Sequence, residues 1–202
     1  YVVGRQADFN LVRLPQEVDF VTAAALGCRF ATSYHALVAQ AQLAAGEWLL
    51  LLGCGGAGLA AVLVAKALGA KVIAVDPSAA ARELALRLGA DVALAGCEPD
   101  EVVALTGGGA QVSLDAYGSA ATARLGVRSL RRRGRHVQVG LMLGPDATAE
   151  LDWNLVVAKE LQVVGAHGMA AADYPELLAR IAGGTLDPAP LVGRVVGLAD
   201  TP

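Results

Sequence analysis

The sequence is short of charged and aromatic side chains and of long uninterrupted apolar runs. Of its 202 residues, 17% are charged and 4% are aromatic, and the net charge is −3 with an isoelectric point near 5.6. A weakly acidic chain argues against nucleic acid as a partner. No apolar run reaches the roughly 18 residues of a membrane-spanning helix without meeting glycine or a charge, so we expect no membrane span.

Cysteine is also scarce. The three cysteines, Cys28, Cys54 and Cys97, are odd in number and widely spaced, which excludes a disulfide framework. We therefore expect a reducing, cytoplasmic setting. Cys54 and Cys97 are interpreted as ordinary small side chains, one in a glycine-rich turn and the other in a loop or core position.

Apolar residues, in contrast, are abundant: they make up 55% of the chain, and the mean hydropathy is +0.50. Such richness suits an α/β protein whose parallel strands are buried on both faces. The chain runs from Tyr1 to Pro202 without an initiator methionine or a signal peptide, and we expect it to be a piece of a longer protein.

The most informative stretch lies between residues 47 and 76. An apolar run, Trp48–Leu52, predicts a buried strand, and the glycine-rich segment Gly53–Gly58 follows it. The pattern then predicts a helix over Ala57–Leu68 and a second strand over Lys71–Val75, which ends on Asp76. This order is one βαβ unit with G-x-G-x-x-G at its first turn, which is typical of dinucleotide binding.

Each part of this unit has a physical reason. Gly53 permits the tight turn, Gly55 lets the backbone approach a pyrophosphate, and Gly58 permits close packing of helix on strand. The helix N-terminus faces the phosphates. Asp76 lies where a carboxylate binds the ribose hydroxyls and repels a 2′-phosphate, which indicates NAD rather than NADP. A glycine-rich turn without a nucleotide and a methyltransferase loop are the alternatives.

The rest of the chain alternates between strand and helix patterns, which predicts a doubly wound parallel sheet. Short strands are expected before Pro15. The further strands are expected at 91–95, 110–115, 135–139 and 161–165, and the further helices at 19–26, 32–42, 78–88, 98–105, 119–132, 151–159 and 174–182.

Several polar residues have a structural explanation. The basic run Arg131–Arg133 is expected at the end of a helix, where it complements the helix dipole. His35 and His136 lie in apolar surroundings and are interpreted as structural, as is His167 between two glycines. Asp115 ends a strand at the ligand-binding edge, and both a ligand role and a cap for the following helix remain open.

A longer pattern surrounds these motifs. The segment AAALGCRFATSYHAL at 23–37, placed about 15 residues before the glycine turn, closely resembles the zinc-dependent medium-chain alcohol dehydrogenases. The resemblance continues through Val75–Asp76, Asp115–Gly118, Gly134–Gly140 and Lys159–Gly165, and so covers nearly the whole chain.

The resemblance implies NAD and zinc as cofactors, and hydride transfer between an alcohol or aldehyde and nicotinamide with zinc as Lewis acid. Cys28 would be a zinc ligand and Thr32 would meet the nicotinamide, both as catalytic residues. The implied cofactor-binding residues are Thr32 at the nicotinamide, Gly53, Gly55, Gly56, Ala57 and Gly58 at the pyrophosphate, Asp76 at the ribose, Ala116 and Tyr117 at the adenine, and Val139, Gly140 and Leu141 at the carboxamide.

The resemblance also implies a domain organisation. Residues 1–25 would be a remnant of a GroES-like catalytic domain with its connection, 26–168 the Rossmann NAD-binding domain, and 169–202 a helix and tail that return to the catalytic domain. A homodimer or tetramer would form through the strand Leu161–Gly165.

The departures from the family pattern matter equally. No C-x-x-C and no H-E pair occurs in the 202 residues, and one thiolate cannot hold a catalytic zinc. We therefore expect a cofactor-binding piece that is inactive by itself. The alternatives are a zinc-free reductase of the quinone oxidoreductase type, against which Cys28 and Asp76 both count, and a non-catalytic NAD-binding module.

Overall fold

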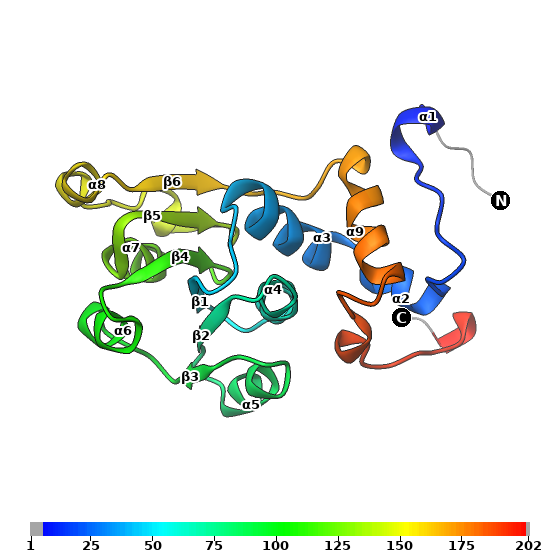
Figure 1. Cartoon of the computed structure of the whole chain (residues 1–202), viewed down its shortest axis with the longest axis horizontal. Helices are drawn as coiled ribbons and strands as arrows, with labels where there is room; N and C mark the ends of the chain where they lie inside the picture. Colours follow the sequence, from blue (N-terminus) through cyan, green and yellow to red (C-terminus); the bar gives the residue numbers. More distant parts are fainter. Residues whose placement is uncertain (1–5, 201–202) are drawn as a thin grey trace.

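The chain folds around one parallel sheet of six strands. Its structure, a computed structural model, describes residues 6–200. The strand order β3-β2-β1-β4-β5-β6 reverses between β1 and β4 (Figure 1), which confirms the doubly wound sheet. The strands are β1 (Trp48–Leu52), β2 (Lys71–Val75), β3 (Val92–Leu94), β4 (Ala110–Asp115), β5 (Leu130–Gln138) and β6 (Gln162–Gly165).

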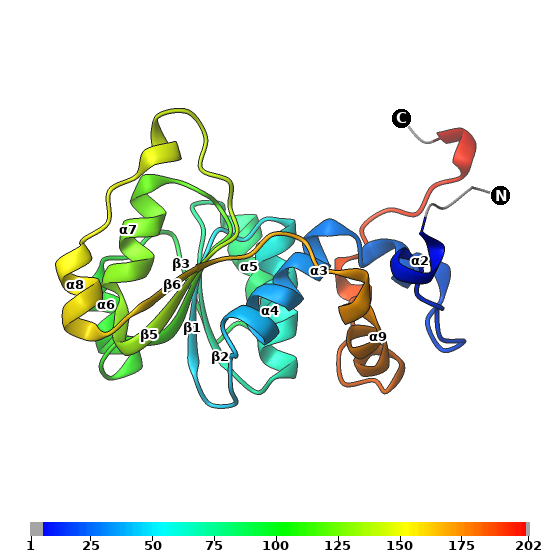
Figure 2. The ribbon, with the colours of Figure 1, turned by 90° about the horizontal axis from the view of Figure 1, so that it is seen from above.

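Helices cover both faces of this sheet. On one face lie α3 (Cys28–His35), α4 (Gly56–Ala67) and α5 (Ala79–Arg87), and on the other lie α6 (Pro99–Thr106) and α7 (Ala120–Arg128) (Figure 2). The helix α8 (Trp153–Lys159) leads into the edge strand β6. None of the helices in the described part is long and apolar enough to cross a membrane.

A further group of elements lies beyond α3, away from the sheet (Figure 2). It contains α1 (Ala7–Asn10), α2 (Phe20–Ala25) and α9 (Tyr174–Ala182). Asp19 caps α2, because its carboxylate accepts a hydrogen bond from the Thr22 amide at 2.8 Å. Short 3-10 turns occupy Gly144–Thr148, Ala171–Asp173, Ala189–Leu191 and Leu198–Asp200.

The packing of the core explains why the sequence of β1 is a continuous apolar run. Leu49 and Leu51 face α3 and α4, whereas Leu50 and Leu52 face the other layer and pack with Val102 of α6. All five side chains are fully buried or nearly so. Burying one such side chain contributes about 1.5–3 kcal/mol, so neither face of the central strand tolerates polar residues cheaply.

Two expectations near the N-terminus are wrong. Between residues 6 and 14 the chain forms the short helix α1 and an extended segment rather than strands; the remainder of that prediction falls outside the described residues. The next helix begins at Cys28 after Gly27, not at residue 32 as predicted. Thr32 and Ser33 are buried inside α3, which continues as a π-helix over Ala36–Gln40.

The predicted position of the basic run is also wrong. The helix α7 ends at Arg128, and Leu130 already pairs with Ala110 as the first residue of β5. The next paired residues are Val112 and Arg135, so the run Arg131–Arg133 lies in a bulge of the strand and not at a helix end. The local signal favours helix, but pairing of the buried Leu130 with a distant strand overrides it.

The close packing of α4 on β1 yields a test. A Cβ atom added at Gly58 would overlap the carbonyl of Gly53, so we expect Gly58→Ala to lower the free energy of unfolding by about 1–3 kcal/mol. Gly165→Ala is the matched control, because nothing lies within 4 Å of a Cβ atom added there. Urea unfolding of both variants measures the difference, and equal stabilities would contradict the packing argument.

Candidate functional site

The carboxyl ends of the central strands form the candidate site. The order of the sheet reverses between β1 and β4, and open α/β sheets bind their ligands at such a point. The loops that leave these strands are joined by backbone hydrogen bonds. The Gly53 amide donates to the Val75 carbonyl and the Ala116 amide donates to the Leu52 carbonyl, both at 2.9 Å.

The glycine-rich turn opens toward solvent at this edge. Gly53 adopts a φ of 93°, which favours glycine, and a Cβ atom added at Gly55 would meet nothing within 4 Å. The helix α4 starts at Gly56 without a side-chain cap. Its first amide groups therefore have no partner within the helix and are available to an anion.

Asp76 stands at the end of β2, beside this turn. Its carboxylate accepts hydrogen bonds from the amides of Cys54 and Ser78, both at 2.8 Å. The guanidinium of Arg82 donates to the carbonyls of Asp76 and Pro77, also at 2.8 Å each. These bonds hold the carboxylate next to the glycine turn, where the spacing predicts it.

A hollow of about 390 Å³ adjoins Asp76. Its walls are mainly apolar and include Val75, Ala95, Tyr117 and Leu125. A pocket with such walls and one carboxylate at its rim suits a flat, apolar ring that carries a sugar. Tyr117 lines this hollow, and the side chain of Ala116 packs against the main core.

The loops after β4 and β5 meet through their backbones. A Cβ atom added at Gly118 would lie 2.5 Å from the Leu141 carbonyl oxygen, so only glycine allows this approach. A second hollow, of about 400 Å³, is lined by residues 138–142 and 165–167. It therefore includes the predicted residues Val139, Gly140 and Leu141, together with His167.

Asp115 is fully buried and organises both loops. Its carboxylate accepts from the Tyr117 amide at 2.9 Å, the Gly118 amide at 2.8 Å, the Thr122 hydroxyl at 2.8 Å and the Gln138 side chain at 3.1 Å. A carboxylate has about four acceptor positions, and four donors fill them. Of the two explanations for Asp115, the geometry supports the structural one.

The network extends from Gln138 into the sheet. The Gln138 amide also donates to the Gly140 carbonyl at 2.9 Å, and its oxygen lies 3.2 Å from His136 Nε2. His136 Nδ1 lies 2.8 Å from the Ser113 hydroxyl. Burial lowers the pKa of His136, and the hydrogen bond to Gln138 and the charge of Asp115 oppose this effect in part. His136 is thus a structural, neutral histidine.

On the other side of the turn, α3 carries Cys28 and Thr32. Cys28 is exposed, and its sulfur lies 3.9 Å from the hydroxyl oxygen of the buried Thr32. The Ser33 hydroxyl donates to the Ala57 carbonyl at 2.7 Å and so fixes α3 against α4. The structure therefore brings Cys28 and Thr32 to the same region as the glycine turn.

Cys28 alone does not make a zinc site. A catalytic zinc takes three protein ligands and an open position. Within residues 6–200, no group of three or more histidine, cysteine, aspartate or glutamate side chains could hold a metal ion. The described residues offer one thiol at this place, and the ligand set that zinc needs is incomplete.

The other two cysteines are poor nucleophiles. Burial, and secondarily the charge of Asp76, raises the pKa of the Cys54 thiol to about 12. Burial, and secondarily the charges of Glu101 and Glu98, raises the pKa of Cys97 to about 11. Both thiols stay protonated near neutral pH, so neither is a reactive thiolate.

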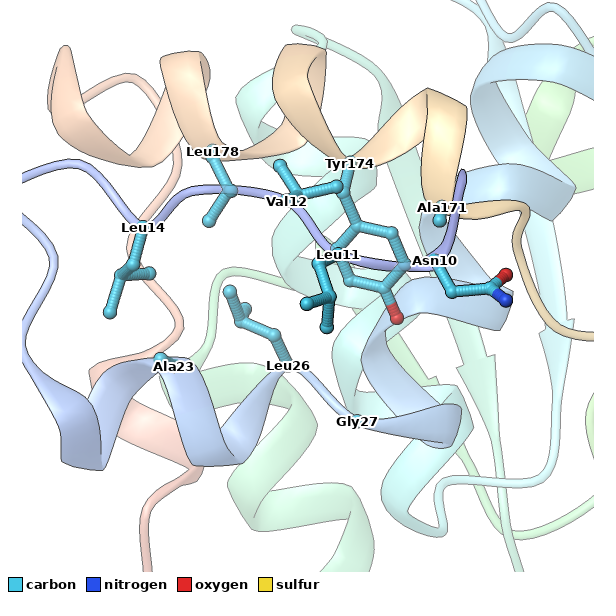
Figure 3. A pocket seen from close by; sticks show the side chains of 10 residues that line it. All are labelled: Asn10, Leu11, Val12, Leu14, Ala23, Leu26, Gly27, Ala171, Tyr174 and Leu178. Carbon is cyan, nitrogen blue, oxygen red and sulfur yellow. The ribbon is translucent and has the colours of Figure 1, made fainter. Parts of the chain in front are cut away.

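A third hollow lies among the elements beyond α3 (Figure 3). It measures about 410 Å³, and side chains of α9, including Tyr174 and Leu178, face Leu26 across it. None of the residues that line it is charged. Since it has no charged side chain, the edge of the sheet is the better candidate for function.

The fold and the edge site together define a doubly wound, Rossmann-like α/β protein, and comparison with known proteins specifies the family. A family model described as zinc-binding dehydrogenase matches residues 56–183. The chain belongs to this family, which confirms the resemblance to zinc-dependent medium-chain alcohol dehydrogenases.

Its relatives include a sorbitol dehydrogenase from Halalkalibacterium halodurans, 34% identical over 184 residues, and an alcohol dehydrogenase from Geobacillus stearothermophilus, 32% identical over 184 residues. The matched residues make up 88% of this chain for the sorbitol dehydrogenase and 90% for the alcohol dehydrogenase. They make up 52% and 53% of the lengths of those two relatives. The chain thus spans about half the length of the curated relatives it matches. The solved alcohol dehydrogenase TADH from Thermus sp. ATN1 superposes with a TM-score of 0.81 at 31% identity, over 90% of this chain and 53% of that one.

The structure adds residues that the sequence analysis did not single out. Gln138 joins the loops after β4 and β5, and Ser33 joins α3 to α4. Gln138 could have been noticed, because it is a polar residue at the carboxyl end of β5 and pairs in register with Asp115 at the end of β4. No local signal distinguishes Ser33.

The buried histidine makes stability depend on pH. Burial holds the pKa of folded His136 below 6.5, so at falling pH the unfolded state binds the proton first. We expect the free energy of unfolding to decrease between pH 7.5 and pH 5.5 with a slope of at most about 1.4 kcal/mol per pH unit.

The variant His136→Gln should flatten this slope, whereas His35→Gln should keep it. Urea unfolding at a series of pH values measures both. An unchanged slope in His136→Gln would show that other groups cause the dependence.

Proposed function

We propose that the chain binds NAD at the carboxyl edge of its sheet and is the cofactor-binding part of an alcohol dehydrogenase. The observation that carries this proposal is the position of the Asp76 carboxylate, between an open glycine turn and a hollow large enough for adenine. Nicotinamide would accept or donate the hydride, and the names of the relatives support an alcohol or aldehyde as the substrate class.

Each predicted cofactor residue has a place in this proposal. The amides at the start of α4, from Gly56 to Gly58, would bind the pyrophosphate, with Gly53 and Gly55 leaving room for it. Asp76 would bind the ribose hydroxyls and Tyr117 would cover the adenine. Thr32 and the backbone of residues 139–141 would border the nicotinamide. The Rossmann unit of this proposal comprises residues 26–168.

The described residues supply only part of the ligand set that a catalytic zinc would need. We propose that Cys28 supplies one thiolate ligand and that the remaining ligands come from outside the described residues, so that the chain alone is inactive. A reducing, cytoplasmic compartment would keep this thiol available. A zinc-free reductase is less favoured, because it needs neither the exposed thiol of Cys28 nor the carboxylate of Asp76.

The selectivity for NAD can be tested directly. We expect NAD to bind at least about tenfold more tightly than NADP, because a carboxylate attracts two hydroxyl groups and repels a phosphate. Asp76→Ala should weaken NAD by a similar factor and remove the preference. Calorimetric titration measures both constants. Equal affinities for NAD and NADP in the unchanged protein would overturn the assignment of Asp76.

The edge strand supports a second proposal, a homodimer or tetramer in which β6 pairs with its copy. Among residues 6–200, β6 pairs with β5 alone, and Val163 is 37% exposed. A charge in such an edge prevents strand pairing.

We therefore expect Val163→Glu to convert the oligomer to a smaller species in sedimentation equilibrium. Val157→Glu, on the exposed side of α8 next to this strand, is the matched control and should leave the mass unchanged. A parent protein that sediments as a monomer would refute the proposal.

A further inference from the structure

An arginine stands at the mouth of the glycine turn. Arg29, the second residue of α3, is exposed, and its side chain lies over Gly56. A Cβ atom added at Gly56 would lie 2.5 Å from Arg29 Cδ, 3.0 Å from Nη1 and 3.3 Å from Nε. Since Gly56 is the first residue of α4, the guanidinium borders the amides that face an anion.

This arrangement accounts for a glycine that the dinucleotide pattern does not require. In G-x-G-x-x-G, the required glycines are Gly53, Gly55 and Gly58, and Gly56 occupies a variable position. A side chain at Gly56 would displace the arginine, because its Cβ atom would collide with the Arg29 stem. Glycine at this position and arginine at position 29 therefore fit each other.

The position of Arg29 relative to the turn is well defined. The Ser33 hydroxyl oxygen lies 2.7 Å from the Ala57 carbonyl oxygen and 3.0 Å from the Arg29 carbonyl oxygen, and the two carbonyls share its single proton. One side chain thus connects the first turn of α3 with the first turn of α4. The backbone that carries the guanidinium keeps its place beside the glycine turn.

In the described part of the chain, no acidic side chain compensates the charge of Arg29. Within residues 6–200, its guanidinium makes no ion pair and no side-chain hydrogen bond, whereas Arg132, Arg133, Arg135 and Arg180 each pair with a glutamate. Its neighbour, the N-terminus of α4, is also positive. Two positive groups side by side repel each other unless an anion lies between them. A guanidinium matches the geometry of phosphate oxygens, to which it donates two hydrogen bonds.

From these observations we infer that Arg29 is a phosphate-binding residue that completes the pyrophosphate site together with the amides of α4. The inference rests on the proposed function, because the anion it assigns is the pyrophosphate of NAD. It adds a charged side chain to a site that otherwise consists of backbone.

The test compares ligands with and without phosphate. NAD, ADP-ribose and adenosine are titrated into the parent chain, Arg29→Gln and the control Arg87→Gln. Arg87 is an exposed arginine at the end of α5, and its side chain takes part in no hydrogen bond or ion pair within residues 6–200.

Arg29→Gln should lower the affinity for NAD and for ADP-ribose about tenfold or more, because a charge-assisted hydrogen bond to phosphate is lost. The affinity for adenosine should be unchanged. The affinity of Arg29→Gln for NAD should also depend less on salt concentration than that of the parent chain. Arg87→Gln should bind all three ligands as the parent chain does.

A second variant separates the contact from general effects. Gly56→Ala should weaken NAD in the parent background by displacing Arg29, but much less in the Arg29→Gln background. Unchanged affinity for NAD in Arg29→Gln, or an equal loss for adenosine, would overturn the role of Arg29. A parent chain that binds neither NAD nor ADP-ribose would refute the proposed function itself, and with it this role.

Discussion

The contact between Gly58 and the Gly53 carbonyl is the constraint on which the site depends. It brings the first turn of α4 against the end of β1, closer than any side chain would permit. The helix N-terminus is therefore directed at the edge of the sheet, beside Asp76. Because the Ser33 hydroxyl joins α3 to this same turn, the positions of Cys28 and Thr32 also follow from the contact.

The opposite side of the cleft is held together by different means. There, the buried Asp115 and His136 and the half-buried Gln138 form a polar network at the ends of β4 and β5. A buried polar group without a partner costs stability, and here the carboxylate of Asp115 has a full set of donors. The loops after β4 and β5 consequently approach each other until the backbones of Gly118 and Gly140 touch.

Much of this fold could be predicted from the sequence, because strands that are buried on both faces must be apolar throughout. The bounds of β1, β2 and β4 agree with the predicted ones, and the spacing of Asp76 from the glycines places it correctly. The errors have a non-local cause. Leu130 belongs to a strand because it pairs with Ala110, which no local pattern shows. The importance of Arg29 and Gln138 was missed for a similar reason, since long side chains acquire their partners only when distant segments meet.

The polar network has a direction. If the Ser113 hydroxyl donates to neutral His136, then His136 donates to Gln138, whose amide in turn donates to the carboxylate of Asp115. Each member is a donor to the next, and the chain ends at a group that can only accept. Such a sequence cannot be altered one residue at a time without leaving a buried atom unpaired. The four side chains therefore stabilise the sheet as one unit, and a change in any of them weakens the hydrogen bonds of its neighbours.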